Sequence, residues 1–245
     1  MKPTVVCVDD DPELLAGVVR TLKSLPIELL STTAPQCALD HLVVAASTLD
    51  AGNDWAFQTL GVRPQPGGRH LTMGTHNALV GLGPRLFVEI IAIDPEGTAP
   101  SRPRWFDLDE PRMRAQLAEG PTLIHWVART NDIELDATRT QFDPGTILPM
   151  RRGDFEWRIT VPDDGHLPAG GLVPTLIQWA DQRHPADALP PAGVHLVALA
   201  GEHPEPALVR AALAALGLSE SLKVTYGRSV RLAAMLRTPR GTVTI

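Results

Sequence analysis

The clearest pattern in the chain is a short apolar run interrupted by a polar side chain, and it occurs four times. The runs at residues 39–44 and 123–128 each carry a histidine near the start. Later runs at residues 87–91 and 176–179 carry a glutamate and a glutamine. Side chains alternate between the two faces of a strand, so a polar residue in such a run faces either solvent or a lined cavity.

These polar residues are spaced as one layout used twice. His41 and Glu89 are 48 positions apart, and His125 and Gln178 are 53 positions apart. We therefore predict that the four side chains converge on one site. Imidazole and carboxylate groups are ligands for Zn²⁺, Fe²⁺, Mn²⁺, Ni²⁺ or Co²⁺, and an amide oxygen is a weaker ligand. The alternative for each residue alone is a buried polar side chain bonded to a neighbour.

The segments between these runs predict a mixed α+β fold. In the first half we expect strands at residues 39–44, 69–82 (one or two, around Gly74) and 85–94, and helices at 48–60 and 109–117. Residues 64–68 and 95–104 are expected to be loops. In the second half we expect strands at 121–130, 153–161 and 173–179 and a helix at 132–140, followed by a βαβββ-like tail over residues 194–245.

The first 38 residues follow a different pattern. A strand at 4–8 leads into the acidic run at 9–11, a helix begins at Pro12, and a second strand covers 27–32, which makes a βαβ unit. This segment resembles the start of a response-regulator receiver domain, but the later strand with the phosphorylated aspartate does not follow. We interpret residues 1–38 as a truncated receiver-like piece joined, as in a bacterial gene fusion, to a different domain. We expect it to pack on the rest of the chain or on a second copy, as in a homodimer.

Composition narrows the classes of partner. The chain has 245 residues, 44% of them hydrophobic, with a net charge of −6 and no dense basic block, so nucleic acid is not an expected partner. No apolar run approaches the roughly 20 residues that span a bilayer. Two cysteines form no disulfide framework, which favours a reducing cytoplasm.

Residues 39–245 resemble the glyoxalase-like branch of the vicinal-oxygen-chelate superfamily. The motifs that carry the resemblance are Leu39-Asp40-His41-Leu42-Val43-Val44, Leu60-Gly61-Val62, Gly67-Gly68-Arg69-His70, Gly74-Thr75-His76-Asn77-Ala78-Leu79 and Glu89-Ile90-Ile91-Ala92-Ile93-Asp94. The resemblance implies two βαβββ modules, at about residues 39–115 and 116–245, that form a half-open barrel. It also implies a divalent metal bound by residues of the first and fourth strands of each module.

On this resemblance the metal ligands would be His41, Glu89, His125 and Gln178. Gln178 departs from the glutamate that glyoxalase-type members use as ligand and base, and an amide does not accept a proton near neutral pH. Glu89 is then the candidate catalytic base.

Four more polar side chains stand in the glycine-rich segment after the helix at 48–60, and His70, His76 and Asn77 could line the mouth of the cavity. For His70 we expect a structural role. His76 and Asn77 would contact the substrate, and Arg69 would hold either an anionic substrate or a surface carboxylate.

Three functions therefore remain open. The first is a metal-dependent lyase, isomerase or dioxygenase that acts on a small oxygenated molecule. The second is a metal-free module that binds a small molecule, and the third is a signalling fusion with a degenerate receiver segment.

Overall fold

The computed structural model describes residues 4–7, 28–31 and 37–245, and the chain divides into the units Met1–Gln36 and Cys37–Ile245. In the first unit, β1 (Thr4–Cys7) pairs in parallel with β2 (Glu28–Ser31). These strands lie where the sequence predicted them. The predicted helix and the acidic run at residues 9–11 lie outside the described residues.

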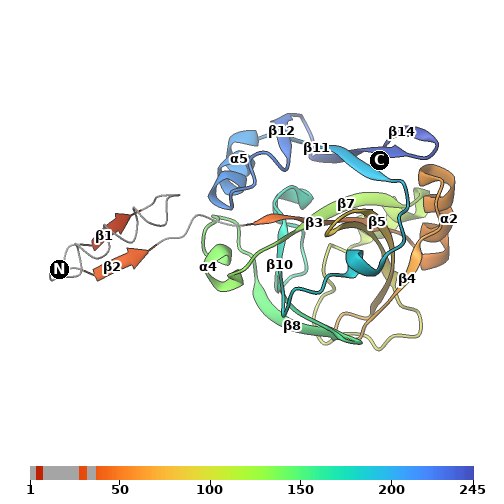
Figure 1. Ribbon diagram of the computed structural model, residues 1–245, viewed down its shortest axis with the longest axis horizontal. Coiled ribbons are helices and arrows are strands. Elements are labelled where there is room, and N and C mark those ends of the chain that lie inside the picture. Colours follow the sequence, from red (N-terminus) through yellow and green to blue (C-terminus); the bar gives the residue numbers. More distant parts are fainter. Residues whose placement is uncertain (1–3, 8–27, 32–36) are drawn as a thin grey trace. The chain divides into compact units, whose positions relative to one another are not determined.

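The second unit is built on a curled eight-stranded sheet with the order β4-β5-β6-β3-β7-β10-β9-β8 (Figure 1). Its first half contains β3 (Ala38–Ala45), α2 (Leu49–Leu60), β4 (Gln65–His70), β5 (Thr75–Gly83) and β6 (Leu86–Ile93). Its second half contains β7 (Thr122–Arg129), α4 (Ile133–Ala137), β8 (Thr146–Arg152), β9 (Phe155–Val161) and β10 (Thr175–Trp179). The predicted α+β fold with paired βαβββ modules is therefore confirmed.

The two halves meet at the centre of the sheet, where β3 pairs antiparallel with β7. Within each half the first strand pairs in parallel with the fourth, β3 with β6 and β7 with β10. The first and fourth strands of both halves are thus neighbours, and the side chains on their shared concave face can form one site.

The edges of the sheet differ from the prediction. Residues 65–68 were expected to be a turn, but they belong to β4, and β8 was not predicted at all. Both strands contain a proline, Pro66 and Pro149, and both lie at an edge of the sheet. An edge strand tolerates proline because its outward side needs no ladder hydrogen bond.

The helix caps follow the sequence closely in the first half. The Thr48 side chain accepts a hydrogen bond from the Ala51 amide, and Gly61 ends α2 in the left-handed conformation with φ 76°. In the second half α4 is shorter than predicted and ends at Ala137. The long connection between the halves carries α3 (Pro111–Glu119).

The tail forms a separate sheet and is not part of the second module. It contains β11 (His195–His203), α5 (Pro206–Ala215), β12 (Lys223–Tyr226), β13 (Arg231–Thr238) and β14 (Gly241–Thr244), with the order β12-β11-β13-β14. This sheet and α5 lie beside the convex side of the larger sheet (Figure 1), and a large hydrophobic core fills the space between them. The concave side is left for a second cluster that is rich in tryptophan.

Candidate functional site

An inner cavity of about 30 Å³ lies on the concave face of the eight-stranded sheet. Its polar lining comes from five strands: His41 on β3, His70 on β4, Asn77 on β5, Glu89 on β6 and Arg152 on β8. Its walls are mainly aromatic and are formed by Phe87, Trp105, Phe106, Trp157 and Trp179. An apolar enclosure with a few convergent polar groups is the usual form of a small-molecule site.

His41 is oriented by the buried carboxylate of Asp40. The β3–β7 register shifts between Leu39 and His41, which places Asp40 at an irregularity of the strand. Asp40 Oδ1 accepts a hydrogen bond from His41 Nδ1 at 2.7 Å, and Oδ2 accepts from Trp179 Nε1 at 3.0 Å and from His184 Nε2 at 3.1 Å. Because a carboxylate only accepts, Nδ1 of His41 carries the proton and Nε2 faces the cavity.

The charge of Asp40 is stabilised by these bonds. Burial by itself would raise the pKa of the Asp40 carboxyl, but the hydrogen bonds from His184 and His41 hold that pKa well below its usual range. His184 is fixed in turn, because its Nδ1 accepts a hydrogen bond from the Ala186 amide at 3.2 Å and so Nε2 carries the proton. Asp40, His41 and His184 therefore form one ordered network under the cavity.

Glu89 is held at one oxygen and left open at the other. The Asn77 amide nitrogen donates to Glu89 Oε1 at 2.5 Å. Asn77 cannot turn over, because its Oδ1 accepts from the Gly68 amide and from Arg152, each at 2.9 Å. Glu89 Oε2 lies 3.7 Å from His41 Nε2, a separation at which no hydrogen bond joins them. Two basic atoms thus face each other across the cavity.

His70 is a third basic group beside the same carboxyl. Its Nδ1 lies 3.0 Å from Thr75 Oγ1, and its Nε2 lies 3.4 Å from the Asn77 amide nitrogen and 3.9 Å from Glu89 Oε1. Burial lowers the pKa of His70 to about 4, so the ring is neutral near pH 7. Since the Asn77 nitrogen is a donor, Nε2 is the ring nitrogen that bears the lone pair.

The other two predicted ligands, His125 and Gln178, are placed elsewhere. His125 Nδ1 donates to the Gly171 carbonyl at 3.1 Å, and Nε2 accepts from the Thr175 amide at 3.1 Å. Burial lowers the pKa of His125 to about 3. Gln178 Oε1 accepts from the Ile133 amide and from Arg158, and its Nε2 donates to the Asn131 carbonyl. The predicted convergence of four side chains is not formed.

The strand register explains the difference. In the first half Val43, two residues after His41, lies opposite Glu89. In the second half Val127, two residues after His125, lies opposite Thr175 and not opposite Gln178. The second half does repeat the layout of the first, but a threonine stands at the position equivalent to Glu89. The hydroxyl of this threonine lies 3.0 Å from His125 Nε2. Gln178 does not line the inner cavity, as its strand neighbours Ile177 and Trp179 do, but it borders a wider hollow beside it.

The residues therefore do not fit the predicted metal site. No group of three or more His, Cys, Asp or Glu side chains in the described ranges has the arrangement of a metal centre. His41 and Glu89 lie together, whereas the ring nitrogens of His125 and the amide of Gln178 are engaged with other protein groups.

Of the residues expected to contact a substrate, Asn77 lines the cavity, and Arg69 and His76 do not. Arg69 pairs with Asp94 at 3.1 Å and with Glu96 on the exposed surface, which is the surface-carboxylate alternative. His76 precedes Asn77 on β5, and its side chain faces the other side of the strand.

Several site residues were missed from the sequence, and His70, for which we expected a structural role, lines the inner cavity. Asp40 adjoins His41, and this adjacency was the available signal for the carboxylate that orients the ring. His184, Trp105 and Arg152 come from distant segments, and nothing in their local sequence marks them as neighbours of His41.

A wider outer hollow of about 660 Å³ adjoins the inner cavity and shares His70, Trp157 and Trp179 with it. It lies along the β8–β9 hairpin and the β4–β5 turn. The outer hollow has the volume of a typical small-molecule site.

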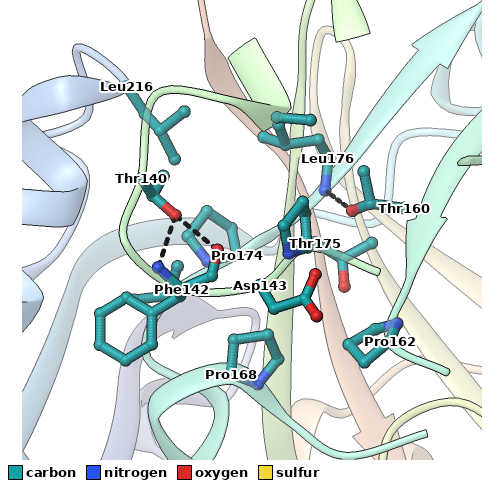
Figure 2. Close-up of a pocket in the computed structure, with 13 residues that line it drawn as sticks. Thr140, Phe142, Asp143, Thr160, Pro162, Pro168, Pro174, Thr175, Leu176 and Leu216 are labelled. Carbon is teal, nitrogen blue, oxygen red and sulfur yellow. Dashed lines mark hydrogen bonds between the residues drawn. The ribbon is translucent and has the colours of Figure 1, made fainter. Parts of the chain in front are cut away.

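Figure 2 shows a different pocket at the start of β10, lined by prolines, Asp143 and Thr175. Its volume is about 10 Å³, roughly the space of one water molecule. Its polar groups are already bonded: Thr160 accepts from the Leu176 amide, and Thr140 bonds to Phe142. This pocket is a packing gap and not a binding site.

The curled sheet of two βαβββ modules, with a cavity on its concave face, is the fold of a vicinal-oxygen-chelate type of protein. A model of the glyoxalase-like domain family matches residues 39–217, which is more than half of the chain. The chain belongs to this family. The match does not include residues 1–38, so the receiver-like resemblance finds no support there.

Solved structures agree at the level of the fold. A hypothetical protein from Staphylococcus aureus matches with a TM-score of 0.56 and 13% identity, covering 80% of this chain and 88% of that one. Methylmalonyl-CoA epimerases from Mycobacterium tuberculosis and Streptomyces coelicolor match with TM-scores of 0.37 and 20% identity, covering 61% and 60% of this chain and 91% and 98% of those chains. TM-scores of 0.37 support no conclusion about this chain. A search of curated proteins found no match.

Proposed function

We propose that the protein binds a small oxygenated molecule in the inner cavity and transfers a proton on it. The observation that carries this proposal is the pair of basic atoms, Glu89 Oε2 and His41 Nε2, which face each other at 3.7 Å between aromatic walls. Neither atom is bonded to the other, so both are available to a ligand that offers an O–H or an acidic C–H. The class of reaction is an isomerisation or epimerisation next to a carbonyl group.

Glu89 is the proposed base. Its Oε2 takes a proton from the carbon beside the carbonyl, and the C–H electron pair moves into the adjacent carbon–carbon bond while the negative charge passes to the carbonyl oxygen. Return of the proton to the other face of that carbon completes an epimerisation. Return to the neighbouring carbon completes an isomerisation, in which the hydroxyl proton passes by way of His41 Nε2 to the former carbonyl oxygen. Asn77 supports this role, because it bonds Oε1 and leaves Oε2 free. A placed base of this kind contributes about 10²–10⁴-fold in rate.

His41 is the proposed partner of the ligand's hydroxyl group. Asp40 holds the proton on Nδ1, so Nε2 presents a lone pair to the cavity. A hydroxyl next to the carbonyl would donate to Nε2 and fix the ligand relative to Glu89. A 2-hydroxycarbonyl compound therefore matches the two basic atoms.

A divalent cation is the second candidate, and His70 is the observation that favours it. His70 Nε2 is a third basic atom beside Glu89, at 3.9 Å from Oε1. His41, His70 and Glu89, all from the first module, would hold the ion once they draw together, and it would polarise the carbonyl oxygen as a Lewis acid. Gln178 and His125 have no part in this version.

Hydrogen–deuterium exchange tests the proposed function without knowledge of the natural substrate. The purified protein is incubated in D₂O with hydroxyacetone and with other 2-hydroxycarbonyl compounds, and loss of the C–H signals is followed by ¹H NMR. We expect exchange that falls at least about 100-fold in Glu89→Gln and is unchanged in His195→Ala, an exposed histidine on β11. Equal exchange by wild type and Glu89→Gln would refute the role of Glu89.

The same assay separates the two candidates. It is repeated after treatment with a chelator and after addition of Zn²⁺, Mn²⁺, Ni²⁺ or Co²⁺, with metal content measured in wild type, His41→Ala, His70→Ala and His195→Ala. Exchange that survives chelation supports the metal-free reaction. Exchange that needs the ion, with metal content lost in the His41 and His70 variants alone, supports the second candidate.

We also infer a cytoplasmic location and a self-associating N-terminal unit. Cys37 is a free thiol, and burial raises its pKa to about 12, which keeps it unreactive. No helix in the described part of the chain is long and apolar enough to cross a membrane. Cell fractionation tests the location, and light scattering of the full chain against a version lacking residues 1–36 tests for a homodimer.

A further inference from the structure

Trp105 carries a buried N–H group that has no hydrogen-bond partner among the described residues. The side chain is 4% exposed, and its Nε1 atom is enclosed by protein. Two other tryptophans are paired: Trp126 Nε1 donates to the Leu172 carbonyl at 3.1 Å, and Trp179 Nε1 donates to Asp40 at 3.0 Å. A buried donor without a partner is costly, so such a group in a native fold needs an explanation.

Trp105 lies in the wall of the inner cavity, and the connection between β6 and α3 holds it there. Its ring stacks on Phe106, with centroids 5.2 Å apart, and meets the His70 ring edge-on at 5.1 Å. The next two residues, Phe106 and Asp107, both adopt the left-handed region, with φ 63° and 58°. Adjacent non-glycine residues in this region are strained, and such strain persists where the surrounding structure enforces it.

The loop is fastened on both sides of Trp105. The Arg104 amide donates to Asp109 Oδ2 at 2.9 Å, and the Asp107 amide donates to the Gly165 carbonyl at 3.0 Å. A strained loop, held on both sides by hydrogen bonds, therefore keeps a residue with an unpaired donor in the wall of a cavity that also contains the carboxylate of Glu89. Glu89 Oε2 and His41 Nε2 lie in the same cavity, and its charged donor, Arg152, is bonded to Asn77.

We infer that Trp105 Nε1 donates a hydrogen bond to the carbonyl oxygen of the bound molecule. The ligand then completes the set: its carbonyl oxygen receives the Trp105 proton while its hydroxyl and acidic C–H face His41 and Glu89. This inference rests on the proposed proton transfer and adds to it the group that fixes the carbonyl. The bond strengthens when charge develops on that oxygen, so Trp105 favours 2-hydroxycarbonyl compounds over simple alcohols.

The indole N–H signals in a ¹H–¹⁵N NMR spectrum test this directly. The chain has five tryptophans, and the signal absent from Trp105→Phe identifies residue 105. The probes are acetohydroxamic acid and hydroxyacetone, which are small, neutral and carry both a carbonyl and an O–H group. We expect the Trp105 signal to move downfield on addition of either probe, and we expect propan-1-ol to leave it in place.

Trp105→Phe removes the donor together with the five-membered ring of the indole, and Trp126→Phe, which removes the same atoms from another buried tryptophan, is the matched control. We expect Trp105→Phe to bind the probes about 5- to 30-fold more weakly and to melt several degrees above Trp126→Phe, since both variants lose the same packing atoms but only Trp126 has an internal bond to lose. Trp126→Phe removes a bonded donor on the far side of the sheet, so we expect a melting temperature several degrees lower and unchanged probe binding.

Each other outcome is decisive. If the probes move other signals but leave the Trp105 signal unmoved, and Trp105→Phe binds them as wild type does, this inference is wrong and the proposed function stands. If Trp105→Phe melts as early as Trp126→Phe, the N–H has an internal partner and the inference fails. If neither probe changes any signal of the wild type, the proposed function fails and the inference with it.

Discussion

Asp40→Asn tests whether the buried carboxylate sets the chemistry of the inner cavity. Asp40 accepts hydrogen bonds from His41 and, at its other oxygen, from Trp179 and His184. An asparagine has one oxygen and one NH₂ group, so its NH₂ group must point either at the His41 N–H or at the N–H groups of Trp179 and His184. The less costly orientation turns the NH₂ group toward His41, because that side loses a single bond.

The expected cost follows from these contacts. A hydrogen bond to a charged group contributes about 1.5–3 kcal/mol, one such bond is lost, and the other two become neutral. We expect the free energy of unfolding to fall by about 2–4 kcal/mol near pH 7. His41 can regain a bond by moving its proton to Nε2, so that Nδ1 accepts from the asparagine. That change converts His41 from an acceptor toward the ligand into a donor toward Glu89.

Two measurements check this reasoning. Urea unfolding gives the loss of stability, and long-range ¹H–¹⁵N NMR of the histidine rings shows which nitrogen carries the proton. The control is Asp181→Asn, which alters an exposed carboxylate paired with Arg183 and should change stability by no more than about 0.5 kcal/mol. An Asp40→Asn protein that is as stable as wild type, with the His41 proton still on Nδ1, would refute the role given to Asp40.

Three further predictions follow from the same contacts. Burial lowers the pKa of His70 to about 4 and the pKa of His125 to about 3. As the pH falls below about 6.5, these rings therefore become protonated in the unfolded state while they stay neutral in the folded state. Unfolding free energy should therefore drop between pH 6.5 and 4, by roughly 3 kcal/mol for His70 alone. Urea titrations over this range should show a shallower drop in His70→Gln, and equal slopes would contradict the assignment. Gly67→Ala places a methyl group 2.0 Å from Asn77 Oδ1, so we expect it to displace Asn77 and cost about 1–3 kcal/mol by urea unfolding, whereas Gly81→Ala meets nothing closer than 3.5 Å and should be nearly neutral. Gln178→Glu removes the donor to the Asn131 carbonyl and should lower stability by about 1–2 kcal/mol without creating affinity for Zn²⁺ in calorimetry, and new affinity would show that residue 178 reaches the site.

Much of the fold could be predicted because the local signals agree with the final contacts. The cap at Thr48 and the left-handed Gly61 fix α2, and the apolar runs identify the four central strands. The edge strands β4 and β8 could not be predicted, because their prolines are typical of loops. Only their position at the sheet edge makes those prolines acceptable.

The candidate site could be predicted only in its first half. His41 and Glu89 lie on paired strands, and their spacing reflects that pairing. Gln178 lies three residues beyond Thr175, which is the residue of the second half that is equivalent to Glu89. In a strand such an odd shift also reverses the face, so a small error in register moved the side chain out of the inner cavity.

The two halves of the sheet therefore share one strand pairing, but their side chains have different roles. In the second half His125 and Thr175 bond to each other and to the backbone, so the equivalent of the reactive pair is closed and serves packing. That half instead supplies enclosure and support: Trp157 and Trp179 form walls, and Arg152 reaches across to Asn77. The open acceptors come from the first half and the unpaired donor, Trp105, comes from the connection between the halves. The proposed ligand would bind such a site in one orientation, because its two ends would meet groups of opposite hydrogen-bonding character.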